Sequence, residues 1–154
     1  MKVVALYISP DHNFFGHHGR PAGENPILSV DEVACVAGHG LKGDRFFDYK
    51  PGYSGQVSFF AQEVHEKLCR EFQLVQVPSS VYRRNVVTCG CDLNELIGKE
   101  FELQGVKFFG YSECKPCYWM DRAVVEGAER WLRGHGGLRA RVLSDGPLRT
   151  EGRS

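Results

Sequence analysis

Two cysteines separated by two residues are the groups in this sequence best suited to chemistry. Cys114 and Cys117 enclose a lysine and a proline, and the residues that follow are apolar and aromatic at helical spacing. Proline suits the first turn of a helix, where its missing N–H leaves no hydrogen bond unmade. We therefore expect Cys117 in the first turn of a helix, where unpaired backbone N–H groups, the helix dipole and the Lys115 ammonium favour its thiolate. A thiolate attacks electrophiles and binds soft metals.

A second pair of cysteines leaves other interpretations open. Cys89 and Cys91 stand one residue apart, and with Cys114 and Cys117 they provide the four thiols that a tetrahedral structural zinc site requires. A thioredoxin-like dithiol built on Cys114 and Cys117 is another alternative, although the β-α-β frame expected around such a motif is missing. In a third alternative, a non-catalytic small-molecule-binding barrel, all four thiols are incidental to the function.

The composition is that of an ordinary globular domain. The chain has 154 residues and a formal net charge of zero, with 19 basic and 19 acidic side chains. This length predicts one domain over residues 1–150, with residues 151–154 as a frayed tail. A neutral chain lacks the broad positive field of nonspecific nucleic-acid binding, and no apolar run is long enough to span a membrane. Because the N-terminus does not resemble a signal peptide, we expect a cytoplasmic protein with free thiols.

A glycine-rich segment, Gly38–Arg45, supplies the first candidate anion-binding residues. Its glycines match the G-x-G-x-x-G pattern of dinucleotide-binding folds, but Pro51 and Gly52 exclude the helix that such a fold needs next. What remains is a tight turn whose backbone N–H groups could face an anion. The alternative is an interstrand turn with a solvated charge pair. The candidate cofactor-binding residues here are Lys42, Gly43, Asp44 and Arg45.

The segment 81–88 is rich in β-formers but is interrupted by Arg83, Arg84 and Asn85. We expect a strand in which Arg83 and Asn85 share one face and Arg84 occupies the other, so that at least one guanidinium points into the domain. A guanidinium suits phosphate or carboxylate because it donates two parallel hydrogen bonds. All three residues are therefore candidates for cofactor binding, the alternative being an exposed edge strand.

The remaining segments alternate short strands with few helices. Strands are expected over residues 3–8, 27–36 with a turn at Asp31, 56–60 and 138–143, with a hairpin over 100–111. Helices are expected over 61–72, 92–98 and 116–133. Because no β-α-β unit repeats, this order predicts a mainly-β or α+β class, a strand-rich β-barrel-like fold with two or three appended helices.

The loop 11–25 carries three histidines: His12, His17 and His18. Three imidazoles in one loop could bind a metal. Their spacing matches no known metal motif, so the alternative is a solvated loop.

Three segments together resemble the MOSC domain, which is named after the C-terminal part of molybdenum-cofactor sulfurase. They are Gly40–Asp44, Arg84–Gly98 and Cys114–Cys117. The closing segment Gly137–Leu143 is similar to the last strand of small stand-alone members. The resemblance spans nearly the whole chain and implies a strand-rich, barrel-like fold.

The resemblance also implies a role with molybdenum cofactor or activated sulfur. Family members are associated with sulfur transfer or with the reduction of N-hydroxylated compounds. By this likeness Cys117 would carry a persulfide sulfur or ligate molybdenum. We expect Cys114 to be an assisting or a structural thiol. The glycine-rich turn and the arginine segment would hold the phosphate of molybdopterin, an anionic small molecule. The chain has no room for the pyridoxal-phosphate domain of sulfurases, so a separate cysteine desulfurase or reductase would supply sulfur or electrons.

Overall fold

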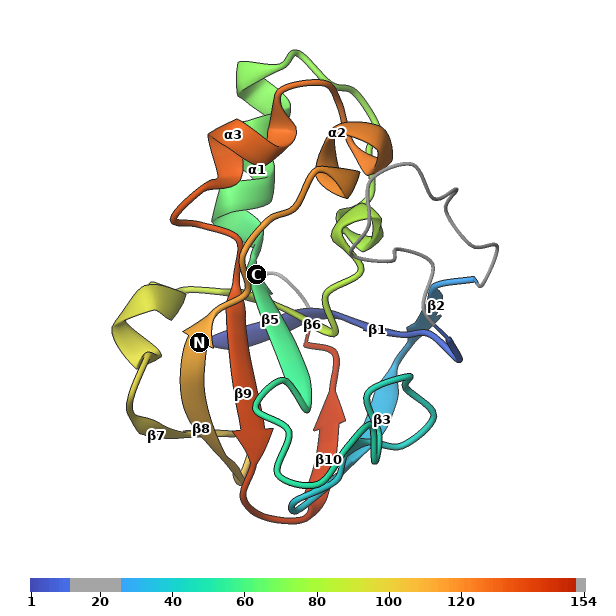
Figure 1. The fold of residues 1–154 in the computed structure, drawn as a ribbon, viewed down its shortest axis with the longest axis vertical. Coiled ribbons are helices and arrows are strands. Elements are labelled where there is room, and N and C mark those ends of the chain that lie inside the picture. Colours follow the sequence, from blue (N-terminus) through green and yellow to red (C-terminus); the bar gives the residue numbers. More distant parts are fainter. Residues whose placement is uncertain (12–25, 152–154) are drawn as a thin grey trace.

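A computed structural model describes residues 1–11 and 26–151, which form two sheets and a helical cap (Figure 1). The larger sheet contains, in spatial order, β2 (Leu28–Val30), β1 (Lys2–Ile8), β6 (Val86–Cys89), β5 (Val57–Ala61), β9 (Leu138–Val142), β8 (Val106–Glu113) and β7 (Glu100–Leu103). The smaller sheet contains β10 (Gly146–Arg149), β3 (Glu32–Val36) and β4 (Gly40–Leu41). The helices are α1 (Gln62–Glu71), α2 (Trp119–Ala123) and α3 (Ala128–Leu132), with 3-10 turns η1 (Ser79–Tyr82) and η2 (Leu93–Leu96).

The strand-rich α+β class predicted from the sequence is confirmed. Every strand pair is antiparallel except β5 and β6, which are parallel and are joined through α1 as a single β-α-β crossover. A parallel pair needs such a crossover because the end of the first strand and the start of the second lie at opposite ends of the pair. The described strands do not close into a barrel; they form an open mixed sheet with a smaller sheet beside it.

Two apolar clusters hold the described part of the chain together, and β5 lies between them. Phe59 packs in the cluster between the sheets, against the rings of Phe101 and Phe108. The next residue, Phe60, faces the other way and stacks on Tyr82 in the cluster under the helical cap. Because successive side chains of a strand point to opposite faces, one buried strand joins both cores.

Most predicted elements are confirmed within one or two residues. The helix expected over 61–72 is α1, the hairpin over 100–111 is β7–β8, and the strand over 138–143 is β9. The strand over 27–36 breaks at Asp31, as predicted, into β2 and β3. Asp92 accepts a hydrogen bond from the backbone N–H of Asn94 and so begins the short 3-10 turn expected there.

The continuous helix expected over 116–133 is wrong. The chain forms two five-residue helices, α2 and α3, with a break at Val124–Gly127. Gly127 has a φ of +93°, a left-handed conformation that a residue with a side chain rarely adopts. The apolar residues that suggested this helix are nevertheless buried, because Met120, Ala128 and Leu132 all pack in the core under the cap.

The strand expected over 81–88 begins only at Val86, so the predicted alternation of faces is also wrong. Residues 79–82 form the 3-10 turn η1, and Arg83 follows it in a left-handed conformation with a φ of +55°. This residue reverses the chain before β6. Its side chain is consequently placed by the turn and not by the two-residue period of a strand.

The ends of the described chain meet at β1. Glu151, which was expected in a frayed tail, donates its backbone N–H to the carbonyl of Val3 and accepts the Val3 N–H on its carboxylate. Residues 152–154 and the histidine-bearing segment 12–25 lie outside the described residues. No helix in the described ranges is long and apolar enough to cross a membrane.

A glycine substitution tests the packing between β9 and β5. A Cβ added to Gly137, at a φ of +109°, would lie 2.2 Å from the backbone oxygen of Phe59. Gly134 also has a positive φ, of +86°, but a Cβ there would meet no atom within 4 Å. We expect Gly137→Ala to lower the free energy of unfolding in urea by about 3 kcal/mol or more, and Gly134→Ala by about 1 kcal/mol. Equal losses would contradict this close approach.

Candidate functional site

A small pocket brings together predicted site residues from three separate parts of the sequence. It encloses about 150 Å³ between the turn after β4, the turn before β6 and the start of α2. Its lining residues are Arg45, Phe46, Val81, Tyr82, Arg83, Arg84, Cys117, Trp119, Met120 and Ala123. Thus the thiol and the three arginines that the sequence analysis selected converge on one pocket, although up to 72 positions separate them.

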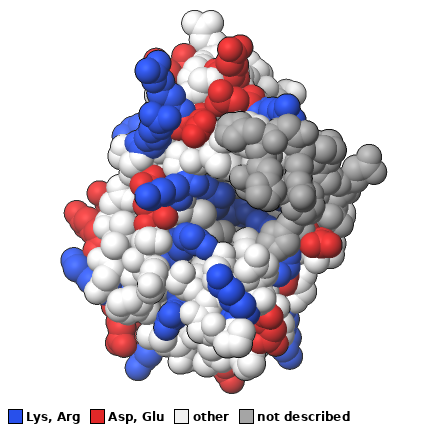
Figure 2. Space-filling model, in the orientation of Figure 1, with Lys and Arg blue, Asp and Glu red and all other residues white. Residues whose placement is uncertain are grey.

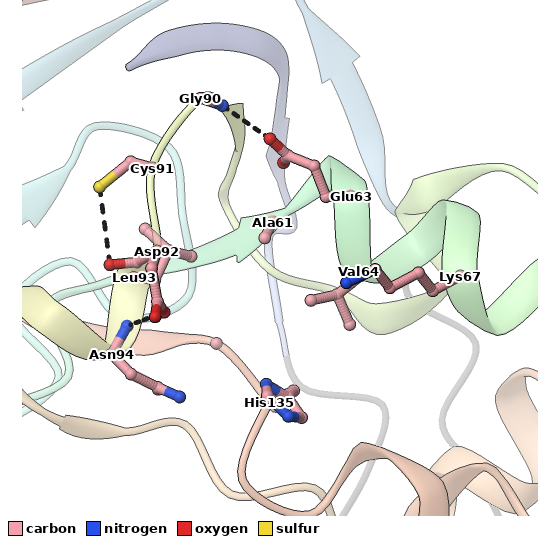
Figure 3. A pocket seen from close by; sticks show the side chains of 11 residues that line it. Ala61, Glu63, Val64, Lys67, Gly90, Cys91, Asp92, Leu93, Asn94 and His135 are labelled. Atoms are coloured by element: carbon pink, nitrogen blue, oxygen red, sulfur yellow. Dashed lines mark hydrogen bonds between the residues drawn. The ribbon is translucent and has the colours of Figure 1, made fainter.

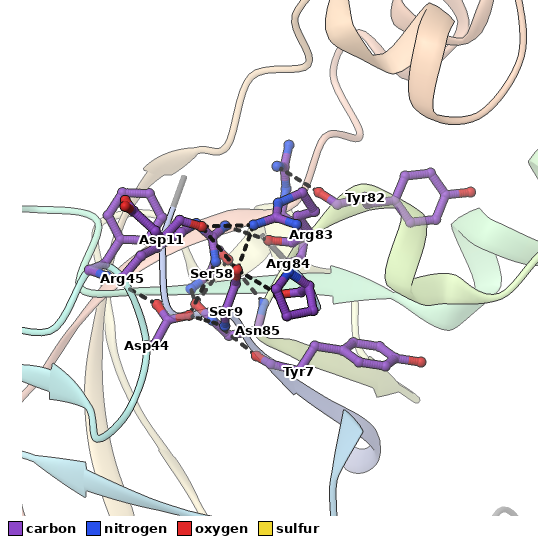
Figure 4. A network of polar contacts seen from close by, with 12 residues as sticks. Tyr7, Ser9, Asp11, Asp44, Arg45, Ser58, Tyr82, Arg83, Arg84 and Asn85 are labelled. Carbon is purple, nitrogen blue, oxygen red and sulfur yellow. Dashed lines mark hydrogen bonds and ion pairs between the residues drawn. The ribbon is translucent and has the colours of Figure 1, made fainter. Parts of the chain in front are cut away.

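The glycine-rich turn is fixed by Asp44, which is buried. Its carboxylate accepts hydrogen bonds from the backbone N–H groups of Ser9, at 3.0 Å, and Phe46, at 3.2 Å. The same carboxylate forms an ion pair with Arg45, at 3.1 Å. Figure 4 shows these contacts as one network with the arginines. Asp44 therefore orients Arg45 toward the pocket and does not itself line it.

The backbone N–H groups of this turn are used inside the protein. The amides of Lys42, Asp44 and Arg45 donate to the carbonyls of Ala34, Leu41 and Ser9. The expectation that these amides face an anion is therefore wrong. Lys42 and Gly43 are exposed and do not line the pocket. The guanidinium groups, rather than the backbone, supply the hydrogen-bond donors of this site.

Arg83 and Arg45 both donate hydrogen bonds to neutral oxygens, and Arg45 also forms the ion pair with Asp44. Arg83 donates through Nη2 to Ser9 Oγ, at 2.6 Å, and to the carbonyl of Asp11, at 3.0 Å. Arg45 donates through Nη2 to the carbonyl of Arg83, at 2.9 Å, and its guanidinium lies over the ring of Phe46. These contacts fix the two side chains before any ligand arrives.

The electrostatic state of the cluster favours an anion. Burial is the main cause that lowers the pKa of Arg45; repulsion from Arg84 acts in the same direction, while Asp44 opposes both. Burial, followed by repulsion from Arg45, lowers the pKa of Arg83 to about 10. The ion pair with Asp44 compensates one of the three guanidinium charges. An anion in the pocket would stabilise the charged forms of the others.

Arg84 connects the pocket to the cysteine segment. It donates to the carbonyls of Gly136, at 3.0 Å, Cys114, at 3.2 Å, and Tyr82, at 3.2 Å. A Cβ on Gly136 would lie 2.2 Å from the Cys114 carbonyl oxygen, so only glycine allows this approach. Arg84 is thus a clamp that joins three segments in addition to lining the pocket.

Asn85 lies outside the pocket and joins three strands. It is completely buried and accepts hydrogen bonds from the N–H and hydroxyl groups of Ser58, at 3.0 and 3.1 Å. Its amide nitrogen donates to the carbonyl of Tyr7, at 3.1 Å. These contacts use its side chain to hold β1, β5 and β6 at the base of the site, so its role in the described fold is positioning.

The two cysteines of the C-x-x-C motif occupy different positions. Cys117 is exposed and lines the pocket, whereas Cys114 is partly buried. Cys117 precedes α2 rather than entering its first turn, and its carbonyl accepts the N–H of Met120. The predicted support from a long helix dipole is therefore wrong. The arginines that line the pocket provide positive charge instead, and Arg84 also holds the backbone of Cys114 through its carbonyl.

The other pair of cysteines belongs to a different region, so the four-thiol zinc site is wrong. Cys91 lines a separate pocket of about 460 Å³ with Glu63, Lys67 and His135 (Figure 3). Burial raises the pKa of the Cys91 thiol, and nearby carboxylates raise it further. Across residues 1–11 and 26–151, no group of three or more His, Cys, Asp or Glu side chains is placed to hold a metal ion.

Sequence reasoning missed the apolar and neutral parts of the site. Phe46, Trp119 and Met120 line the pocket, and Ser9 binds both Asp44 and Arg83. Trp119 and Met120 resembled ordinary core residues of a helix. The serine lies at the end of β1, and only the three-dimensional contact with Asp44 identifies it.

Solved structures match this fold, although no protein-family model and no curated protein matches the sequence. The YuaD protein from Bacillus subtilis has a TM-score of 0.71 at 19% identity, over 97% of this chain and 91% of that one. YiiM from Escherichia coli has a TM-score of 0.62 at 18% identity, over 97% and 71% of the two chains. YiiM from Geobacillus stearothermophilus has a TM-score of 0.66 at 12% identity, over 96% and 70%. Because all three identities are below 20%, these likenesses show the fold alone.

Thiol alkylation tests the exposure of Cys117. With limiting iodoacetamide at about pH 8, we expect Cys117 to react before Cys91 and Cys35. Cys117 is exposed, whereas burial raises the pKa of Cys91 and raises that of Cys35 to about 12. Peptide mass spectrometry over a time course measures the order. Earlier labelling of Cys35 or Cys91 in the folded protein would contradict this arrangement.

Proposed function

We propose that this protein handles activated sulfur or molybdenum cofactor, with Cys117 as the residue that carries the sulfur or ligates the metal. The observation that supports this most directly is the pocket in which an exposed thiol adjoins Arg45, Arg83 and Arg84. A thiolate is a good acceptor for sulfane sulfur and a good ligand for a soft metal. The arginines suit an oxyanion because they are planar, permanently charged donors.

The residues fit part of a molybdopterin-type cofactor. Three guanidinium groups and one ion-paired carboxylate leave positive charge for a phosphate, and the thiol supplies a soft ligand. The pocket of about 150 Å³ is smaller than the roughly 300 Å³ at which sites for whole small molecules begin. It therefore suits a phosphate or a sulfur-bearing group, with the rest of a pterin extending beyond it. When bound, the cofactor would supply the oxidation–reduction chemistry of molybdenum.

Sulfur loading needs only a thiolate and a persulfide donor. The Cys117 thiolate attacks the outer sulfur of a donor persulfide, R–S–SH. A new S–S bond forms on Cys117, the S–S bond of the donor breaks, and the donor leaves as the thiolate R–S⁻. The guanidinium groups stabilise the negative charge at each stage. The donor is a separate protein of the cysteine-desulfurase class.

Mass spectrometry after incubation with a cysteine desulfurase and free cysteine tests this function. We expect the wild-type protein to gain sulfur on the peptide that contains Cys117. Cys117→Ala should abolish this gain, while Cys114→Ala should reduce it only severalfold. Cys91→Ala is the matched control, because that thiol lines the other pocket, and it should load like the wild type.

Two results would overturn the assignment. Sulfur that still accumulates on Cys117→Ala would place the acceptor elsewhere. Complete loss in both Cys114→Ala and Cys117→Ala would favour a dithiol mechanism, in which the two thiols form a disulfide.

A further inference from the structure

We propose that the outer face of β9 and the loop after β4 form a binding site for a small anion that carries an aromatic ring, such as a nucleoside monophosphate. This surface is separate from the Cys117 pocket and does not depend on the chemistry of that thiol. It is a shallow hollow of about 470 Å³, within the roughly 300–1,000 Å³ range of small-molecule sites. Its lining residues are Tyr49, Lys50, Gly52, Tyr53, Ser54, Tyr111, Arg139 and Arg141.

The charge of this surface selects an anion. Lys50, Arg139 and Arg141 contribute three cations, and none of the described residues that line the hollow carries a carboxylate. Figure 2 shows Lys and Arg side chains over the lower centre of this face, where β9 and the loop after β4 lie in Figure 1. The sequence predicts a half-buried strand here with alternating apolar and basic residues, and both arginines indeed point to the outer face of β9.

One donor on this surface is left without an acceptor. The Nε of Arg141 is buried and has no hydrogen-bond partner among the described residues, although Nη2 of the same guanidinium donates to the carbonyl of Gly52, at 2.8 Å. A buried N–H without an acceptor is unfavourable. The carbonyl of Gly52 carries no formal charge, so the positive charge of this guanidinium remains to attract an oxyanion.

The second arginine is also held in place before any ligand binds. Arg139 donates to the Tyr53 hydroxyl and its guanidinium lies 5.4 Å from the centre of the Tyr53 ring. A Cβ on Gly55 would lie 2.8 Å from Nη2 of Arg139, so glycine leaves the room in which this side chain lies. A fixed guanidinium loses little conformational freedom when it binds an anion.

Exposed tyrosine rings on this surface favour a ligand with an aromatic part. Tyr49 and Tyr111 are each 50% exposed. Tyr111 lies at an irregularity of β8, between the pairs Gly110–Ala140 and Ser112–Arg139, and such bulges redirect a side chain. Its ring is 5.6 Å from the Arg141 guanidinium. Exposed rings beside cations are the arrangement on which nucleobases stack.

A small molecule fits better than a nucleic-acid strand. The chain has a formal net charge of zero, so it lacks the extended positive field that a polyanion requires. The hollow is also of limited extent, and a ring contact separates it from the Cys117 pocket: Phe46, which lines that pocket, stacks on Tyr53 with ring centres 5.7 Å apart. We therefore expect a ligand about the size of one nucleotide.

Calorimetric titration with AMP, adenosine and ribose 5-phosphate tests the proposal. AMP should bind at least about tenfold more tightly than either fragment, because only AMP engages both the tyrosines and the arginines. Arg141→Gln should weaken AMP binding by about tenfold, and Tyr111→Leu by about fivefold, while Tyr111→Phe keeps the ring and the affinity. Arg133→Gln, an exposed arginine outside the surface, is the matched control.

Three outcomes would overturn the proposal. They are equal affinity for AMP and ribose 5-phosphate, an equal loss of affinity in Arg133→Gln and Arg141→Gln, and affinity for oligothymidylates that rises with their length. Circular dichroism on each variant identifies any that fails to fold, and Tyr111→Phe then serves as the folded comparison for Tyr111→Leu. Cys117→Ala should leave AMP affinity unchanged, so failure of sulfur loading and failure of this site can be distinguished.

Discussion

The site depends on three guanidinium groups packed together with one ion-paired carboxylate. Asp44 binds Arg45, and the carbonyl of Arg83 accepts a hydrogen bond from Arg45 in turn. Burial is the main reason why the pKa of both Arg45 and Arg83 is lowered, and repulsion between the guanidinium groups lowers it further. Hydrogen bonds offset part of the cost of this burial, because the guanidinium of Arg83 donates to the Ser9 hydroxyl and to the main-chain carbonyl of Asp11. The charge that remains uncompensated is the basis for the proposal that the pocket binds an anion.

The same contacts explain how a short cysteine segment reaches the pocket. Arg84 holds the carbonyls of Cys114 and Gly136, and Gly136 is small enough to let the two segments touch. Trp119 and Met120 are both buried at the start of α2, and Met120 packs in the core beneath the cap. Cys117 is left exposed between these anchors. An exposed thiol is thus held in place by anchored residues on either side of it.

The sequence predicted the parts of this arrangement that follow local rules. The period of α1, the hairpin of β7 and β8 and the cap at Asp92 were recognisable because neighbouring residues decide them. Arginine and cysteine were recognisable as candidates because few structural roles call for them. Only the resemblance to a family predicted that Arg45, Arg83 and Cys117 lie in one site, because no local pattern encodes proximity across 72 positions.

The secondary-structure predictions were wrong where the backbone conformation of a single residue interrupts a regular sequence pattern. Gly127 in a left-handed conformation divides an apolar stripe that reads as one helix, and Arg83 in a left-handed turn ends an apparent strand. Similarly, the amides of the glycine-rich turn meet partners from β1 and β3 that the sequence does not reveal. The site therefore relies on side-chain cations, and the resemblance to solved structures at 12–19% identity extends to the fold rather than to these details.

We propose that an oxyanion binds between the arginines and within reach of Cys117. Anomalous diffraction from a crystal soaked in tungstate measures this directly, because tungstate resembles molybdate in shape and charge. We expect a peak enclosed by Arg45, Arg83 and Arg84 on the side of the Cys117 sulfur, and we expect this peak to be lost in a crystal of Arg45→Gln. Tungstate bound elsewhere, with the arginine pocket empty, would contradict binding of the oxyanion beside Cys117.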